Sequence, residues 1–266
     1  MLPPPRLSLN KRAARVESES RPLWLVGDGV STFVGALNRN QLHSHSVPVL
    51  LTGIYGRFRF RSEDGAWISC RSALVPAGQG YEFDMRGEPL SVIYLEPDLA
   101  GVDALAPLIT NATERDGTLH GDNTYSPMLR SMFEDQASGI WAEDALQDLI
   151  RFAKPRARQC LDARITRALD ILRDDCAGNM PAHVAAAAVG LSASRFQHVF
   201  SDAVGVPYRR YRAWQRMLLA IREVVSGANF TTAAHAAGYA DQAHFAREFR
   251  RTFGAAPSIG IANVRG

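Results

Sequence analysis

The sequence predicts an α+β protein with more than one domain, in which a strand-rich N-terminal half precedes an all-α C-terminal half. Short apolar segments divided by turn residues fill residues 23–97, whereas helical periodicity begins near residue 102. Within the helical part, one pattern recurs at an offset of 49 residues. A chain of 266 residues with 46% hydrophobic content can form two ordinary domains with packed cores.

Residues 1–22 are expected to form a flexible N-terminal arm. They contain basic residues but no apolar stretch, so they do not resemble a secretory signal peptide. No apolar run in the chain reaches the ~18 residues that a membrane span needs. The three cysteines, Cys70, Cys160 and Cys176, are odd in number and widely spaced, which is typical of reduced thiols. We therefore expect a cytoplasmic protein with no membrane contact.

Residues 23–100 are expected to form a small β-barrel or a sandwich. Phe58 and Phe60 alternate with arginines, which is the period of a strand with one face in water. Several short strands at such spacing, separated by turn residues, favour a closed or two-layered sheet. The segments that we expect to be strands are 48–52, 55–61, 66–70, 72–75 and 90–95.

Residues 101–158 are expected to form a helical linker and dimerisation region. Ser126 is the expected cap of one of its helices, with Pro127 in the first turn, and Lys154-Pro155-Arg156 is the expected linker to the next domain. Apolar stripes of helical period make the helices between 124 and 153 the candidate surface of a homodimer. The expected helices cover 102–109, 126–133 and 141–152.

Residues 159–266 contain two copies of one helical pattern. Each copy begins with an alanine-rich segment and a glycine and continues with a capped amphipathic helix. A helix of small residues, a tight turn and a second helix predict two helix-turn-helix subdomains. The residues that match between the copies are Ser192 and Asp241, Phe196 and Phe245, Phe200 and Phe249, and Gly205 and Gly254.

One long helix is predicted between the two copies, at residues 207–226. Pro207 begins it and Gly227 ends it. A helix of this length spans roughly 30 Å, whereas successive segments of a DNA major groove lie about 34 Å apart. One chain could therefore present two reading helices to one face of a duplex.

Basic residues are concentrated in the C-terminal part of the chain. Residues 151–266 contain 17 Lys and Arg but 8 Asp and Glu, whereas residues 1–150 contain 13 basic and 19 acidic residues. This asymmetry favours a polyanionic partner, nucleic acid first. The alternative is an arginine-rich surface that faces solvent.

The C-terminal pattern resembles the AraC/XylS family of bacterial transcription regulators over about 100 residues. Residues 237–258 follow the family pattern almost throughout, and residues 189–200 with Gly205 fit its first unit. The aromatic–arginine pair that commonly ends the family pattern is replaced here by Ile259-Gly-Ile. The resemblance implies that the second helix of each unit enters the major groove of double-stranded DNA, with RNA polymerase as a further candidate partner.

Carried over by position, the resemblance assigns DNA contacts to both second helices. Glutamine can pair with adenine and arginine with guanine, while an alanine methyl group can contact a thymine methyl group. Arg195, Arg250 and Arg251 are assigned to phosphate or solvent, and a phosphate contact or a surface ion pair stays open for Arg247. The candidates are Ser194, Arg195, Gln197 and His198 in the first unit and Gln242, Ala243, Ala246, Arg247, Arg250 and Arg251 in the second.

The N-terminal half resembles the cupin barrels that many regulators of this family carry. Residues 41–45 with Gly53 look like the first cupin segment, and residues 75–81 look like the second. Metal-binding cupins use three histidines and a glutamate, whereas this chain keeps His43 and His45 and has Tyr81 in the place of the third histidine. Two imidazoles alone are a poor metal site, so we expect no metal and no other cofactor. Glu82 or Asp84 are the alternatives that would complete a two-histidine, one-carboxylate set.

These features predict a sequence-specific DNA-binding transcription regulator, not an enzyme, with a small-molecule effector in a cupin-like barrel. Three alternatives stay open: a metal-dependent cupin enzyme fused to a DNA-binding domain, a regulator without a ligand, and a barrel filled by its own side chains. The expected lining of the effector pocket is His43, His45, Tyr55, Phe58, Phe60, Trp67, Tyr81 and Phe83.

Overall fold

The computed structural model describes residues 21–27, 29–99, 101–153, 161–175, 180–262, 264 and 266. Most of the expected N-terminal arm, the expected linker at 154–156, and both Cys160 and Cys176 lie outside the described residues. No helix within the described ranges has the length and the apolar character that a membrane crossing requires.

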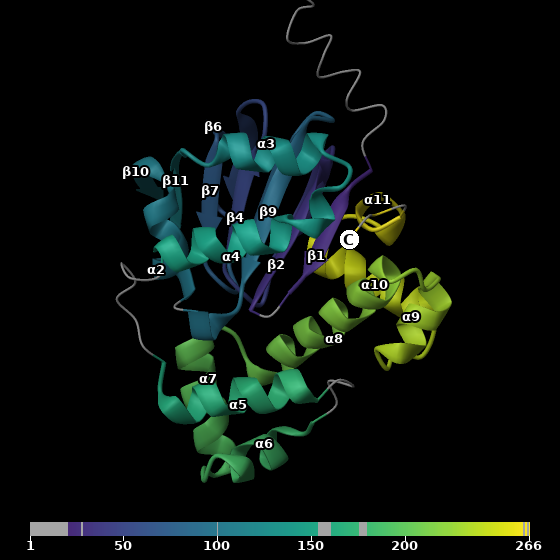
Figure 1. Cartoon of the computed structure of the whole chain (residues 1–266). Helices are drawn as coiled ribbons and strands as arrows, with labels where there is room; N and C mark the ends of the chain where they lie inside the picture. Colours follow the sequence, from purple (N-terminus) through teal and green to yellow (C-terminus); the bar gives the residue numbers. More distant parts are fainter. Residues whose placement is uncertain are drawn as a thin grey trace, which may run out of the picture.

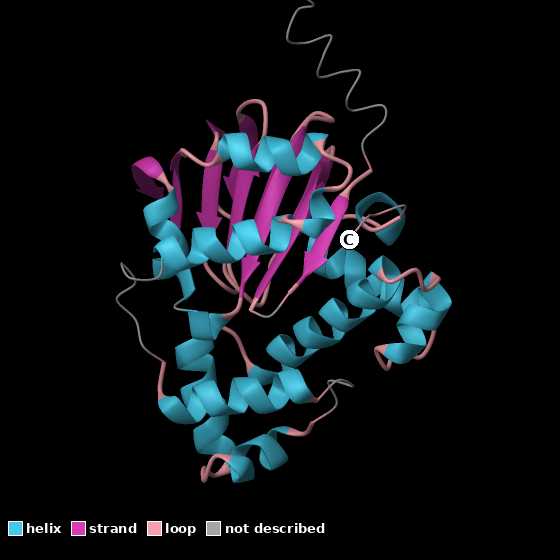
Figure 2. Cartoon of the chain, in the orientation of Figure 1, coloured by secondary structure: helices cyan, strands magenta, loops and turns pink. Residues whose placement is uncertain are grey.

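The N-terminal half contains two separate sheets with antiparallel pairing rather than a single closed one, and we call these two sheets together the barrel (Figure 2). The larger sheet has the order β1 (Leu23–Val26), β2 (Val30–Ala36), β9 (Pro89–Leu95), β4 (Val49–Gly53), β7 (Ser72–Val75), β11 (Thr118–Asp122) and β10 (Thr110–Arg115). The smaller sheet has the order β3 (Arg39–His43), β8 (Tyr81–Asp84), β5 (Phe58–Ser62) and β6 (Ile68–Cys70).

The central strands of the larger sheet are buried on both faces. Leu51 of β4 packs in the core between the two sheets, together with Phe58 and Phe60 of β5. Leu50 of β4 points the other way, into a second core under a layer of helices. A strand that is buried on both faces reads as a continuous apolar run, whereas β5, with one face in water, alternates as predicted.

Short helices form the layer over the outer face of the larger sheet (Figure 1). Leu146 and Ile150 of the last helix are buried in that layer. The apolar stripes that suggested a dimer surface therefore pack against the chain's own sheet. The helices are η1 (Pro97–Leu99), α2 (Gly101–Leu105), η2 (Ala106–Leu108), α3 (Ser126–Glu134), η3 (Ser138–Ile140) and α4 (Ala142–Ala153).

Two expectations for residues 101–158 are wrong in detail. The region is not wholly helical, because β10 and β11 form a hairpin at the edge of the larger sheet. Ser126 is the first residue of α3 and not its cap, which is Tyr125. The side chain of Asn123 takes the capping role, since its Oδ1 accepts a hydrogen bond of 2.8 Å from the Ser126 amide.

The C-terminal half is all-α, and its two helix-turn-helix units lie at opposite ends of α8 (Figure 1). The predicted long helix is confirmed, with Pro207 and Ser226 as the residues that flank it. The elements are α5 (Ala163–Asp174), α6 (Ala182–Ala188), α7 (Ala193–Val204), α8 (Tyr208–Val225), α9 (Phe230–Ala236), α10 (Gln242–Phe253) and α11 (Pro257–Gly260).

Candidate nucleic-acid interface and effector cavity

The second helix of each unit begins with the predicted side-chain cap. Ser192 Oγ accepts a hydrogen bond of 3.3 Å from the Arg195 amide, and Asp241 Oδ1 accepts one of 2.6 Å from the His244 amide. The turns before them use Gly190 and Gly238, with φ of 69° and 70°. Glycine adopts a positive φ without the steric penalty that other residues meet. The repeated glycine therefore fixes the angle between the two helices of each unit.

The candidate residues of α7 form an exposed polar surface. Ser194, Arg195, Gln197 and His198 are all exposed, while Phe196 and Phe200 on the opposite side are completely buried. His198 Nε2 lies 3.3 Å from Asp202 Oδ2, one turn further along the helix. The phenylalanines therefore hold the unit together and leave the polar side of α7 free for a partner.

The candidate residues of α10 also lie at the surface. Ala246 is half-buried, and the other five candidates, Gln242, Ala243, Arg247, Arg250 and Arg251, are exposed. Gln242 Oε1 accepts a hydrogen bond of 3.1 Å from Thr231 Oγ1, and Arg251 pairs with Glu248 at 2.8 Å. The side chains of Arg247 and Arg250 make no hydrogen bond or ion pair with the part of the chain that the structure describes.

A narrow cavity of about 30 Å³ lies between the sheets and the C-terminal end of α10. His43, Tyr81 and Phe83 line it from the barrel side, and Phe249 and Phe253 close it from α10. The sequence places Phe249 in the repeat of the helix-turn-helix unit but carries no signal for this second role.

Three further predicted residues belong to the same aromatic core. His45 Nδ1 lies 3.1 Å from the Tyr81 hydroxyl, and Phe60 stacks on the Tyr81 ring with centroids 5.8 Å apart. Phe58 meets Phe83 edge-on, with centroids 6.4 Å apart. Burial lowers the pKa of His43 to about 4, so its imidazole is neutral at pH 7.

Tyr55 and Trp67 do not line the cavity, which corrects the prediction for these two residues. Tyr55 faces the helical layer, where its hydroxyl donates a hydrogen bond of 2.9 Å to Glu134 of α3. Trp67 lies on the outer face of the smaller sheet, with the guanidinium of Arg59 4.7 Å from its ring centroid. Tyr55 and Trp67 both precede a strand. The alternation of side chains within a strand does not determine which face of the sheet such a residue lies on.

The carboxylates considered for a metal set do not join the histidines. Glu82 accepts hydrogen bonds from Arg39 and Arg61, both on the outer face of the smaller sheet. The described ranges contain no group of three or more His, Cys, Asp and Glu side chains arranged to hold a metal ion. His43 and His45 contact each other and the aromatic core, with ring centroids 5.0 Å apart.

The end of α10 is bonded directly to the barrel. The Gln41 amide of β3 donates a hydrogen bond of 3.1 Å to the Gly254 carbonyl, and Asn40 donates from its side chain to the Phe253 carbonyl. Trp24 Nε1 donates one of 2.9 Å to the Gly260 carbonyl. The second helix-turn-helix unit and the cavity therefore share a wall.

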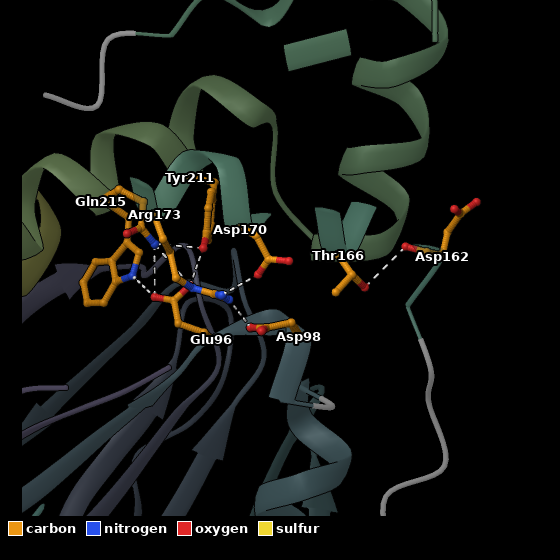
Figure 3. A network of polar contacts seen from close by, with 9 residues as sticks. Glu96, Asp98, Asp162, Thr166, Asp170, Arg173, Tyr211 and Gln215 are labelled. Atoms are coloured by element: carbon orange, nitrogen blue, oxygen red, sulfur yellow. Dashed lines mark hydrogen bonds and ion pairs between the residues drawn. The ribbon is translucent and has the colours of Figure 1, made fainter. Parts of the chain in front are cut away.

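A second polar junction joins the loop after β9 to α8 and α5 (Figure 3). Glu96 is buried there and accepts hydrogen bonds from Tyr211, Trp214 and Gln215 of α8. Asp98 forms an ion pair of 2.5 Å with Arg173 of α5. Sequence analysis missed this junction, because no local pattern marks a carboxylate whose partners lie more than 100 residues away.

Comparison with known proteins agrees with this arrangement. Residues 185–259 match the helix-turn-helix domain family. The chain is similar to ToxT from Vibrio cholerae strain SCE256 with a bound unsaturated fatty acid, at 13% identity and a TM-score of 0.58, over 90% of this chain and 98% of that chain. No curated protein matches the chain by sequence.

A second ToxT structure gives the same result. It is ToxT from Vibrio cholerae O395 bound to (E)-4-(8-methylnaphthalen-1-yl)but-3-enoic acid, with 12% identity and a TM-score of 0.53, over 86% of this chain and 97% of that chain. At these identities the likeness shows a shared fold. The expected succession of a sheet-rich domain and a double helix-turn-helix domain is thereby confirmed.

Proposed function

We propose that this chain, which has an AraC-type helix-turn-helix domain and the fold of the AraC-family regulator ToxT, is a sequence-specific DNA-binding transcription regulator controlled by a small effector. The observation that carries the proposal is the pair of capped helices, α7 and α10, with exposed polar faces at the two ends of α8. Gln197 and Arg247 supply the hydrogen-bonding groups that read adenine and guanine.

The length of α8 supports recognition by both units at once. Its 18 residues correspond to about 27 Å of helix axis, to which the widths of the two units add. Successive major-groove segments on one face of a duplex lie about 34 Å apart. We propose that α7 and α10 of one chain occupy such neighbouring segments.

The proposed effector site is the cavity between the sheets and α10. The ligands named for the ToxT structures are carboxylic acids with apolar bodies, and we propose an effector of similar apolar character here. A volume of about 30 Å³ is enough for a water molecule but not for such a ligand. Binding therefore requires Phe249 and Phe253 to move away from the sheets, which would shift α10 and change how the chain binds DNA.

The remaining partners follow from the same proposal. A regulator of transcription acts on double-stranded DNA in the cytoplasm and works together with RNA polymerase. A homodimer stays part of the proposal, but its surface must lie outside the buried apolar stripes of α3 and α4. Regulation, and not catalysis, is the proposed activity.

Selection from random duplex DNA tests the proposal. We expect the purified chain to enrich one sequence with two conserved blocks about one helical turn apart, and to bind it at least a thousandfold more tightly than random DNA. Fluorescence anisotropy at fixed ionic strength measures both affinities. Equal affinity for the selected and the random DNA would contradict the proposal.

A further inference from the structure

A wide groove lies between the barrel, α8 and α10, apart from the effector cavity. Its volume is about 790 Å³, within the range of small-molecule sites. The barrel contributes Ser44 and Ser46 from the loop between β3 and β4. The arginines that line the groove are Arg209, Arg210, Arg212 and Arg216 of α8 and Arg251 of α10.

The groove is rich in positive charge. Glu248 is the one carboxylate among the residues that line it, and it pairs with Arg251 at 2.8 Å. Arg210 donates a hydrogen bond of 3.1 Å to the Ser44 carbonyl, and Arg216 donates one of 3.0 Å to the Ala237 carbonyl. These carbonyls fix the guanidinium groups in place without neutralising them, and a concave wall concentrates their field.

The electrostatics of Arg210 agree with this description. Its side chain is half-buried, and burial together with the nearby charge of Arg251 lowers its pKa. Because Arg251 contributes to this lowering, the two positive charges repel each other across the groove. An anion placed between them would remove this repulsion.

Among the candidate DNA-contact residues, Arg251 alone lines the groove. His244, Glu248 and Arg251 lie on one stripe of α10, at spacings of four and three residues. The candidates for DNA contact at 243, 246, 247 and 250 form a neighbouring stripe on another side of the helix. The groove stripe faces the barrel loop, and Trp214 and Met217 of α8 give it an apolar floor.

We propose that this groove binds a small organic anion with two or more phosphate or carboxylate groups. Guanidinium groups bind both kinds of group in bidentate pairs, and Arg209, Arg210 and Arg216 together exceed what one monovalent anion needs. The apolar floor would accept the carbon skeleton of the ligand. Because Ser44 belongs to the barrel and Arg251 to α10, a bound anion would hold the two halves of the chain together.

The binding of the anion is independent of the function proposed above, whereas its effect on DNA affinity rests on that function. Isothermal titration calorimetry with inorganic pyrophosphate and with citrate tests the binding and distinguishes the two kinds of group. We expect at least one of them to bind saturably at a 1:1 ratio. The Arg209→Gln and Arg251→Gln variants, both at exposed positions, should each weaken that binding about tenfold or more.

Arg222→Gln is the matched control, because Arg222 is an exposed arginine of α8 that does not line the groove. It should leave the affinity for the anion unchanged. The proposal is overturned if neither anion binds saturably, or if Arg222→Gln weakens binding as much as Arg251→Gln. It is also overturned if the groove variants lose affinity for random DNA while their anion affinity equals that of the wild type. A failed DNA selection with intact anion binding would count against the proposed function alone.

Discussion

The indole Nε1 of Trp214 donates a hydrogen bond of 3.0 Å to the carboxylate of Glu96, so that the helix between the two helix-turn-helix units is tied to the last long strand of the barrel. Tyr211 and Gln215 donate to the same carboxylate from the same side of α8. Glu96 is 6% exposed, so these donors are satisfied by one acceptor that water cannot replace. The geometry of the DNA-binding domain therefore depends on a residue of the barrel domain.

Glu96→Ala should lower the stability of the whole chain. It leaves the buried donors of Tyr211 and Trp214 without an acceptor, which costs about 1–3 kcal/mol for each group that stays unsatisfied. The expected result is a lower melting temperature, together with faster proteolysis between the halves, measured by calorimetry and limited digestion. Glu114→Ala, at an exposed carboxylate of β10, is the control and should change neither. Unaltered melting of Glu96→Ala would show that the junction contributes nothing.

The same residue should give the chain a pH dependence. Burial raises the pKa of Glu96 above its ordinary value of 4.5, and hydrogen bonds from Tyr211 and Trp214 oppose this shift. The charges that face the carboxylate are Arg173, which lowers the pKa, and Asp98, which raises it. A raised pKa in the folded state means that the contribution of Glu96 to stability is complete below pH 4.5 and is lost as the pH rises through the raised value.

Glu96→Gln should remove that contribution, since its amide does not titrate. The melting temperature of the variant relative to the wild type should therefore rise between pH 4.5 and pH 8, when both are measured at constant ionic strength. Parallel curves over this range would mean that Glu96 has the same pKa in the folded and the unfolded chain.

Gly254→Ala should destabilise the chain by more than the backbone strain of a non-glycine residue at positive φ, because the added Cβ also clashes with the barrel. Gly254 has φ of 68°, and an added Cβ would lie 2.5 Å from the Gln41 carbonyl oxygen. Gly190 has nearly the same φ of 69° but nothing within 4 Å of an added Cβ. Gly190→Ala therefore measures the backbone strain, about 1–2 kcal/mol, and Gly254→Ala should cost about 1–3 kcal/mol more. Denaturant unfolding gives the difference, and equal losses would contradict the docking contact.

The sequence predicts best what local chemistry decides. Ser192 and Asp241 cap their helices, and Gly205 and Gly254 end them in the left-handed region, because each signal acts within one helical turn. Contacts between the halves are different in kind. Nothing near Glu96 in the sequence indicates Trp214, and nothing near Gln41 indicates Gly254, since three-dimensional packing alone brings them together.

The hairpin β10–β11 was missed for a related reason. Every residue of β10 is exposed, so it lacks the apolar alternation that identifies a strand. Its pairing with β11, in which Thr113 lies opposite His120, is decided by the backbone and by the neighbouring strand β7. An edge strand of this kind has the sequence pattern of a loop, so a sheet domain expected to end at residue 100 leaves out a hairpin that pairs with β7.

Phe253→Ala should enlarge the effector cavity and destabilise the chain. Phe253 is 6% exposed and packs on Phe249 with ring centroids 4.5 Å apart. Removing a buried phenyl group costs about 3–5 kcal/mol, and the enlarged cavity should bind indole, which would raise the melting temperature of the variant. Phe230→Ala is the control, because Phe230 is half-buried on α9 and does not line the cavity. Indole binding to neither variant or to both would contradict the position of the cavity.

Arg247→Ala and Gln197→Ala should weaken binding to the selected DNA by about 1–3 kcal/mol each if the two side chains read bases. Both side chains are exposed on the second helices of their units, so their removal leaves the fold intact. Their losses should be small on random DNA.

Arg250→Ala should instead weaken binding to both DNAs alike and reduce the slope of log K against log salt by about one. Arg151→Ala on α4 is the control for the charge of the chain and should change none of these values. If Arg247→Ala behaves like Arg250→Ala, Arg247 contacts phosphate, and sequence reading by α10 then depends on Gln242 and the methyl groups of Ala243 and Ala246.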